Sequence, residues 1–276
     1  MRGTMRRCIA AIRLLVIGVW VMAGEGVKGP APLVRAHSHN DYQHERPCLD
    51  ALDCGFCSIE ADIYLVEGKL LVGHDPRDLK AERTLQKLYL EPLRERVAAN
   101  GGRVYRDGPG VTLLIDIKTE AEGAYGSLRG VLKEYAGMLT VFRADKTEAG
   151  AVTVIVSGNR PRKTMAAEAV RYAGCDGRLE DLDTADSAHL IPLISSNWVL
   201  TFKWRGVGEF PQEEKETLKE LVAKAHKAGR RIRFWSAPDD AAGWSELLAA
   251  EVDLVNTDHL GELRDFLLKR ANATNK

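Results

Sequence analysis

The sequence predicts an α/β fold in which eight parallel strands close into one (β/α)8 barrel, the TIM-barrel architecture. Short apolar runs rich in β-branched residues alternate with longer amphipathic helical patterns, as they do in βαβ units. The chain has 276 residues, of which 45% are hydrophobic. A barrel of this kind occupies about 250 residues as a single domain. His37 to Asp41 follows the first strand where a Gly-rich nucleotide-binding turn would stand, which disfavours a doubly wound open sheet.

Each expected strand is a short apolar run between polar or turn-forming residues. The strands are expected at Leu33 to His37, Ser58 to Val66, Val111 to Lys118, Val152 to Ser157, Gly177 to Asp181, Trp198 to Lys203, Ile232 to Ser236 and Val252 to Asn256. Helical patterns lie at Pro47 to Asp53, Leu85 to Ala99, Tyr125 to Leu139, Pro161 to Arg171, Glu213 to Ala228 and Gly243 to Ala249. Glu67-Gly68-Lys69 predicts a tight hairpin turn within the second unit. We expect a single domain over residues 33–268.

The first 24 residues predict a secretory signal peptide. Arg2, Arg6 and Arg7 precede an apolar run of ten residues from Leu14 to Ala23. A membrane-spanning helix needs roughly 20 apolar residues, so an uncleaved N-terminal membrane anchor is the weaker alternative. We therefore expect export to the periplasm or the outside of the cell.

The charge balance limits the partners of the protein. With 39 basic and 39 acidic residues the net charge is zero, so no long-range field attracts nucleic acid or an anionic membrane. Nucleic acid is therefore not an expected partner, and an anionic substrate has to be captured locally. A transient membrane contact and the oligomeric state are left open.

Four cysteines follow the predicted signal peptide, at positions 48, 54, 57 and 175. An even number is typical of disulfide bonding in an exported chain. Buried free thiols are an equally good reading, because a domain of this size does not depend on disulfides. The spacing matches no zinc site.

Three carboxylates occupy strands that should meet at one end of the barrel. Glu60 and Asp62 alternate within an apolar strand and therefore project from the same face, while Asp116 lies on the next parallel strand. Like charges so placed repel unless a cation neutralises them. Carboxylate ligands favour a hard divalent ion, Mg2+ first and Ca2+ as an alternative. The competing interpretation is a set of structural salt bridges with Lys118, Lys203 or arginines.

Two histidines follow strand-like runs on either side of this acidic strand. His37 ends the first strand, and His74 ends the hairpin partner of the second. Cleavage of a P–O bond needs a base for the attacking hydroxyl and an acid for the leaving oxygen, and imidazoles titrate near neutral pH. His37 and His74 are therefore the candidate catalytic residues, with His39 and His44 as candidate substrate contacts.

Three further residues are candidate substrate-binding groups. Lys118 alternates with Asp116 and can face the same mouth, where it would offer a cation to phosphate oxygens. Lys203 at the end of the sixth expected strand could do the same. Trp235 closes the seventh expected strand, where it either packs over a substrate or caps the core.

These motifs resemble those of the phospholipase C-like phosphodiesterase superfamily, in particular the glycerophosphodiester phosphodiesterases and the sphingomyelinase D type phospholipases. The matching segments are Ala36-His37, Glu60-Ala61-Asp62, Val72-Gly73-His74-Asp75 and Ile115-Asp116-Ile117-Lys118-Thr119. Asp116 with Lys118-Thr119 is closer to the sphingomyelinase D pattern, because glycerophosphodiesterases usually have glutamate there.

The resemblance is closer to the branch named after the yeast altered inheritance of mitochondria protein six, and it covers nearly all of the mature chain. Its segments are His37-Ser38-His39-Asn40-Asp41-Tyr42, Arg46-Pro47, Gly177-Arg178-Leu179-Glu180-Asp181, Ser196-Asn197-Trp198, Phe202-Lys203-Trp204, Arg233-Phe234-Trp235 and Asn256-Thr257-Asp258. That branch is named by a phenotype, so it identifies no substrate.

The resemblance implies metal-assisted cleavage of a phosphodiester, in which a neighbouring substrate hydroxyl attacks to give a cyclic phosphate that water can open. It implies shared acid and base roles for His37 and His74, with the three carboxylates holding the ion and Lys118 contacting phosphate oxygens. The substrate class would be a glycerophosphodiester or a (lyso)phospholipid-like lipid. Ser38 and His39 replace the arginine and glycine of the glycerophosphodiesterase HRG motif, so the phosphate contact would come from Lys118 or Arg178.

Two other functions are compatible with the same residues. His37-x-His39 is similar to the metal-binding pair of amidohydrolases and related phosphatases, but those sites need more imidazoles on later strands, where Glu180-Asp181 and Lys203 stand. A non-catalytic exported barrel that binds a ligand around a structural ion is the third reading.

Overall fold

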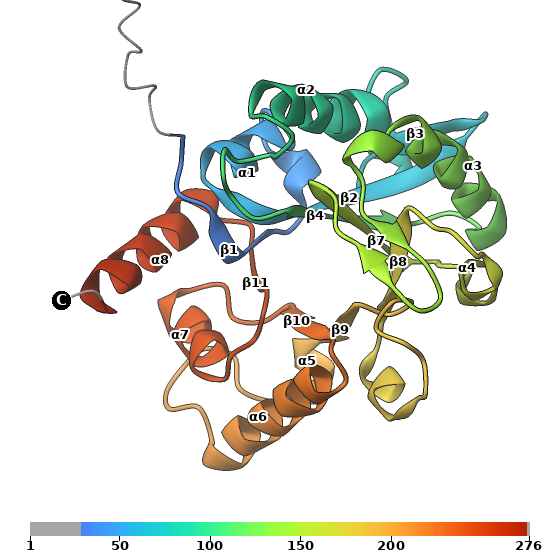
Figure 1. Ribbon diagram of the computed structural model, residues 1–276. Coiled ribbons are helices and arrows are strands. Elements are labelled where there is room, and N and C mark those ends of the chain that lie inside the picture. The colour runs from blue at the N-terminus through green and yellow to red at the C-terminus, as the bar shows by residue number, and fades with distance from the viewer. Residues whose placement is uncertain (1–28, 275–276) are drawn as a thin grey trace, which may run out of the picture.

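The computed structural model of the protein describes residues 29–274, and it confirms the eight-stranded parallel barrel (Figure 1). Neighbouring strands follow the order β10-β9-β8-β7-β4-β2-β1-β11. Their bounds are Leu33–Ser38 (β1), Phe56–Val66 (β2), Val111–Ile117 (β4), Val152–Gly158 (β7), Ala173–Gly177 (β8), Leu193–Asn197 (β9), Arg231–Trp235 (β10) and Val255–Thr257 (β11). A parallel bridge between Arg233 and Leu254 joins β10 to the chain just before β11 and nearly closes the barrel.

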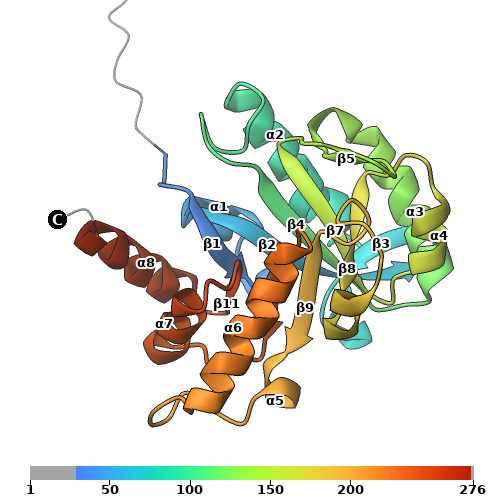
Figure 2. The ribbon, with the colours of Figure 1, turned by 60° about the horizontal axis from the view of Figure 1, so that its bottom comes forward.

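Helices surround the strands in both ribbon views (Figures 1 and 2). They are α1 (Leu49–Asp53), α2 (Glu91–Ala99), α3 (Ala121–Glu134), α4 (Arg162–Ala167), α5 (Trp198–Thr201), α6 (Gln212–Lys227), α7 (Ala241–Ala249) and α8 (Leu260–Thr274). A π-helical segment, Gln86–Leu90, leads into α2. The sequence did not predict α8, which continues past the expected end of the domain at residue 268.

The predicted hairpin is confirmed. β2 pairs antiparallel with β3 (Lys69–Val72), and Val66 lies opposite Lys69. The two turn residues, Glu67 and Gly68, have φ angles of 47° and 79°, as a two-residue type I′ turn requires. A second small hairpin of β5 (Val141–Phe142) and β6 (Thr147–Glu148) precedes β7. The first hairpin brings His74 back toward the end of the barrel where the parallel strands finish.

Two strand predictions were wrong in position. The expected strand at Gly177 to Asp181 is a 3-10 helix from Leu179, and β8 lies just before it in a segment of small residues around a buried Asp176. The expected strand at Trp198 to Lys203 is α5 and a loop, because the fully buried Trp198 ring packs on Phe202 with centroids 4.2 Å apart. The apolar residues there fill the space outside β9 rather than form a strand.

The barrel interior is apolar in one layer and polar in the next. Leu114, Ile155, Leu193 and Leu254 form a buried cluster inside the barrel that is separate from the main core between strands and helices. Two residues later, at the next inward position of the same strands, the side chains are polar. They are Asp116, Ser157, Ser195 and Asn256. The interior is thus plugged with leucine and isoleucine below a polar layer at the carboxyl ends of the strands.

The predicted signal peptide, residues 1–24, lies outside the described residues. None of the helices in the described part of the chain is long and apolar enough to cross a membrane. Cys48, Cys54, Cys57 and Cys175 are all unpaired in the structure.

Candidate active site

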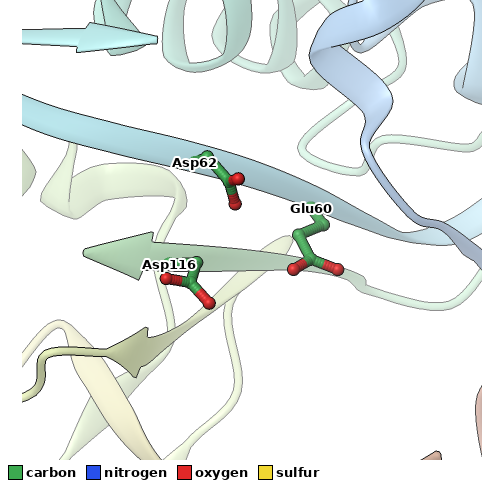
Figure 3. Close-up of side chains that lie close together, drawn as sticks. All are labelled: Glu60, Asp62 and Asp116. Atoms are coloured by element: carbon green, nitrogen blue, oxygen red, sulfur yellow. The ribbon is translucent and has the colours of Figure 1, made fainter. Parts of the chain in front are cut away.

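Three carboxylates converge inside the mouth of the barrel. Glu60 and Asp62 project from β2, and Asp116 projects from β4 toward the same space (Figure 3). Asp62 and Asp116 are direct partners in the parallel register. One oxygen from each of the three lies within 4.8 Å of the others. Among residues 29–274 this is the one group of three or more histidine, cysteine or acidic side chains arranged so closely, and the predicted convergence is confirmed.

Two cations contact the three acids. The Lys118 ammonium lies 3.1 Å from Oδ2 of Asp62 and 3.2 Å from Oδ1 of Asp116. Nη1 of the buried Arg233 donates to Oε2 of Glu60 at 3.0 Å. The salt bridges considered from sequence therefore exist for Lys118. They leave three acids facing two cations.

The environment treats the three carboxyl groups differently. Burial, followed by the charge of Glu60, raises the pKa of Asp62 to about 6, and burial also raises the pKa of Asp116. Burial opposes ionisation of Glu60 as well, but Arg233 and the hydrogen bond with His37 hold its pKa well below the usual range. Because two pKa values stay raised despite Lys118, the neighbouring cations do not fully compensate the negative charge.

The donor set fits a hard divalent cation. All three groups offer oxygen, their oxygens lie close enough to share one ion, and one negative charge exceeds the local positive charge. Oxygen ligands of this kind suit Mg2+ or Ca2+ better than a thiophilic metal. The raised pKa values of Asp62 and Asp116 indicate that another cation nearby would be stabilising.

His37 lies fully buried on one side of the carboxylates. Its Nδ1 is 2.7 Å from Oγ of Ser58, and its Nε2 is 3.0 Å from Oε2 of Glu60. Burial lowers the pKa of His37 to about 4, so the imidazole is neutral at pH 7. The Ser58 contact fixes the ring and leaves Nε2 directed into the mouth.

His74 lies on the other side and is more exposed. Its Nδ1 is 3.3 Å from Oδ2 of Asp62 and 3.0 Å from the hydroxyl of Tyr42, which itself donates to Asp62 at 2.8 Å. No contact among the described residues engages Nε2 of His74. The two predicted histidines therefore flank the acidic pair, His37 beside Glu60 and His74 beside Asp62.

Arg233 is a site residue that the sequence analysis missed. Besides Glu60 it reaches Nε2 of His37, 2.9 Å away, and its Nε donates to Oγ of Ser195 at 2.9 Å. Ser195 in turn donates to Asp176 at 2.7 Å, which extends the polar network to β8. The signal was an arginine at the inward-facing position of an apolar strand, where a buried charge needs a partner.

Asn256 is a second missed residue. It lies on β11 in register with His37, so both side chains face the barrel interior. The residue is 8% exposed, and both its amide nitrogen and its amide oxygen lack hydrogen-bond partners among the described residues. Buried amides are normally paired, so this one is available to a ligand at the mouth.

The remaining predicted residues divide. Trp235 ends β10 beside the network, with the Arg178 guanidinium 5.2 Å and that of Arg233 5.9 Å from its ring centroid. Arg178 also donates to Asp176 at 2.7 Å. Lys203 was wrongly placed at a strand end: it lies in the exposed loop after α5, and its ammonium forms no ion pair within residues 29–274.

His39 does not form a metal-binding pair with His37. Its Nδ1 lies 2.9 Å from Oδ1 of Asp258, and Nδ2 of Asn40 is 3.0 Å from the same nitrogen. The two imidazoles thus have separate partners, which gives no support to the amidohydrolase reading.

Comparisons with known proteins agree with this geometry. A model described as the AIM6-like phosphodiesterase domain matches residues 29–174, and one for the glycerophosphoryl diester phosphodiesterase family matches residues 231–261. The altered inheritance of mitochondria protein 6 homolog of Arthroderma benhamiae is 30% identical, over 84% of this chain and 83% of that protein. Altered inheritance of mitochondria protein 6 of Saccharomyces cerevisiae is 26% identical, over 81% of this chain and 68% of that protein.

Solved structures of glycerophosphodiester phosphodiesterases share the fold. The Agrobacterium tumefaciens protein superposes with a TM-score of 0.51 at 16% identity, over 85% of this chain and 99% of that one. The Parabacteroides distasonis protein gives the same TM-score at 13% identity, over 87% and 99%. With its barrel, its acidic cluster and its relatives, the chain belongs to the AIM6-like phosphodiesterase family.

Proposed function

We propose that the chain is a metal-dependent phosphoric diester hydrolase that acts on a glycerophosphodiester or a (lyso)phospholipid-like substrate. One observation carries the proposal: Glu60, Asp62 and Asp116 converge within 4.8 Å between two histidines. The AIM6-like match supports a phosphodiesterase, and the proposal adds the metal, the catalytic residues and the substrate class.

Glu60, Asp62 and Asp116 would hold the ion, Mg2+ in the first instance and Ca2+ as the alternative. Such an ion supplies positive charge that stabilises phosphate oxygens as negative charge develops on them. Lys118 and Arg233 border the same space and would contact the remaining phosphate oxygens. Arg233 thereby offers the guanidinium that the absent HRG arginine supplies in glycerophosphodiesterases.

His37 and His74 would move the protons. The neutral His37 directs Nε2 into the mouth and is suited to accept the proton of a substrate hydroxyl next to the phosphate. His74, held at Nδ1 by Tyr42 and Asp62, presents Nε2 on the exposed side, where it can protonate the leaving oxygen. Attack by the hydroxyl gives a cyclic phosphate, and water can then open it.

Hydrolysis assays test this proposal. Purified protein should cleave bis-(para-nitrophenyl) phosphate or a lysophospholipid, lose activity with a chelator and regain it with Mg2+. His37→Ala and His74→Ala should each lower kcat by at least about 100-fold. His189→Ala is the matched control, because His189 is exposed and bonds Thr147 far from the acids. Full turnover by folded His37→Ala and His74→Ala proteins would reject the mechanism, and no turnover by wild type would favour a ligand-binding barrel.

The location and the partners belong to the same proposal. We propose export after cleavage of residues 1–24, with small-molecule or lipid diesters and no nucleic acid as partners, and a transient membrane contact for lipid substrates. Mass spectrometry of the N-terminus of the mature protein checks the cleavage. A mature protein that starts at Met1 would favour an uncleaved anchor.

A further inference from the structure

A solvent-open hollow of about 440 Å³ lies beside His74. Its walls come from the turn after β1 and from the segment that follows β3. We call it the His74 hollow. It is lined by Tyr42, Gln43, His44, Val72, Gly73, His74, Arg77, Asp78, Lys80 and Arg83.

The hollow adjoins the acidic cluster through two shared residues. The Tyr42 hydroxyl and Nδ1 of His74 line the hollow and lie 2.8 Å and 3.3 Å from Oδ2 of Asp62. A molecule whose phosphate contacts Asp116 and Lys118 would therefore extend past His74 into this space. The volume suits a phosphate or carboxylate group with the few atoms that attach it to the diester.

The charges on the walls are unevenly compensated. Arg77 pairs with Asp75 at 3.0 Å, and Asp78 accepts from the backbone amide of Asp75. Arg83 donates only to the backbone oxygen of Tyr42, at 2.6 Å. Within the described part of the chain neither Arg83 nor Lys80 forms an ion pair with a carboxylate.

A buried imidazole nitrogen adds to this polarity. His44 lines the same hollow, and its Nε2 is buried without a hydrogen-bond partner among residues 29–274. Buried polar atoms without partners are rare, and they are explained when a ligand supplies the partner. An anion accepts hydrogen bonds from imidazole, ammonium and guanidinium groups alike.

We infer that the His74 hollow binds a second anionic group of the substrate, a phosphomonoester or a carboxylate carried by one of the two alcohols of the diester. The inference rests on the proposed function and deepens it. The preferred substrate is then a phosphodiester with extra negative charge, either soluble or as the headgroup of a lysophospholipid. Lys80 and Arg83 are its specificity-determining residues.

Kinetic selectivity tests the inference. Glycerophosphoglycerol is compared with the same diester carrying a terminal phosphomonoester, and lysophosphatidylglycerol is compared with its headgroup-phosphorylated form. The phosphorylated member of a pair should have a kcat/KM at least about tenfold higher, since charged hydrogen bonds are of that strength. Lys80→Gln and Arg83→Gln should each lower this ratio toward one, whereas Lys69→Gln, an exposed lysine outside the hollow, should leave it unchanged. The pair that shows the larger ratio identifies the soluble or the lipid source.

A binding measurement separates this inference from the proposed function. With a chelator present, the three carboxylates repel anions, so inorganic phosphate should bind in the hollow and shift the His44 imidazole resonances. The double variant Lys80→Gln/Arg83→Gln should lose that shift. Equal cleavage of both members of each pair, with no effect of the variants, overturns the inference and leaves the proposed function standing. Absence of any cleavage, with the phosphate shift retained, overturns the proposed function and the substrate assignment while the anion site stands.

Discussion

Nη1 of Arg233 lies 2.9 Å from Nε2 of His37 and donates to Oε2 of Glu60 at 3.0 Å. One side chain from β10 therefore touches a histidine of β1 and a carboxylate of β2 across the mouth of the barrel. The three groups are buried, so each depends on the others for its charge and its hydrogen bonds. This contact ties the closure of the barrel to the geometry of the candidate active site.

Replacement of Arg233 should be strongly destabilising. Arg233→Met leaves the buried Glu60 charge without its cation, and removal of one partner of a buried pair costs about 3–5 kcal/mol of unfolding free energy. Arg233→Met/Glu60→Gln should recover much of the loss, because it removes the unpaired charge. Urea unfolding with a chelator measures both, with Arg129→Met, whose pair with Glu168 is exposed, as a control that changes stability little. A single variant as stable as wild type would contradict the pairing.

The contacts of Arg233 also show where prediction from sequence ends. Strand period alone placed Glu60 and Asp62 on one face, and parallel order placed Asp116 beside them, because both follow from local geometry. Arg233 meets Glu60 only because the barrel closes, a contact between residues 173 positions apart. No pattern within one strand specifies it.

The errors in strand position have a different cause. Lys203 was placed at a strand end because Trp198 to Lys203 is apolar and aromatic, yet those rings pack outside β9 against Phe210. The real strand contains inward Ser195, and β8 contains buried Asp176, so their polar side chains hid them from a search for apolar runs. The same polar layer that forms the site thus weakened the signal for the strands that carry it.

The ionisation of Asp62 should make stability depend on pH. Burial raises its pKa to about 6, against about 3.9 in an unfolded chain, so the native state binds the proton more tightly. The Asp62 contribution to the unfolding free energy should therefore fall by about 2–3 kcal/mol as pH rises from 4 to 6. The stability difference between wild type and Asp62→Asn in chelator isolates this effect.

Other groups act in the opposite direction over similar pH values. The depressed pKa of Glu60 and the lowered pKa of His37 both make the native state lose stability as the pH falls. The two contributions largely cancel in the difference between wild type and Asp62→Asn. Addition of Mg2+ should reverse the sign for Asp62, because the ion favours the charged carboxylate. A flat difference in chelator would show that Asp62 is not forced toward its neutral form.

Gly158 should be irreplaceable for the position of Asp116. Its φ is 65°, and an added Cβ would lie 2.2 Å from Oδ1 of Asp116 and 2.5 Å from the carbonyl oxygen of Ile117. Gly158→Ala should destabilise the protein and weaken Mn2+ binding at least about tenfold, as displacement of a ligand does. Gly126→Ala is the control, since a Cβ there has no neighbour within 4 Å and alanine favours a helix. Titration calorimetry with unchanged affinity in Gly158→Ala would contradict the role of Asp116.

The Tyr42 hydroxyl should position His74. It lies 3.0 Å from Nδ1 of His74 and donates to Asp62, and burial raises its pKa, so it stays protonated as a donor. Tyr42→Phe should lower kcat about tenfold with a smaller change in KM, and it should shift the acid and base limbs of the pH–rate profile. Tyr135→Phe, which loses a contact with Glu91 far from the mouth, should have wild-type kinetics. A parallel rise in KM with constant kcat would instead indicate a role in substrate binding.

Anomalous diffraction from crystals grown with Mn2+ tests the central claim most directly. The account predicts one Mn2+ peak bounded by Glu60, Asp62 and Asp116, with Lys118 moved from its contacts with Asp62 and Asp116, and no peak in crystals of Asp116→Asn. A saturating Mn2+ soak that leaves Lys118 between these acids with no peak beside them, or that places the metal on His37 and His39, would contradict it.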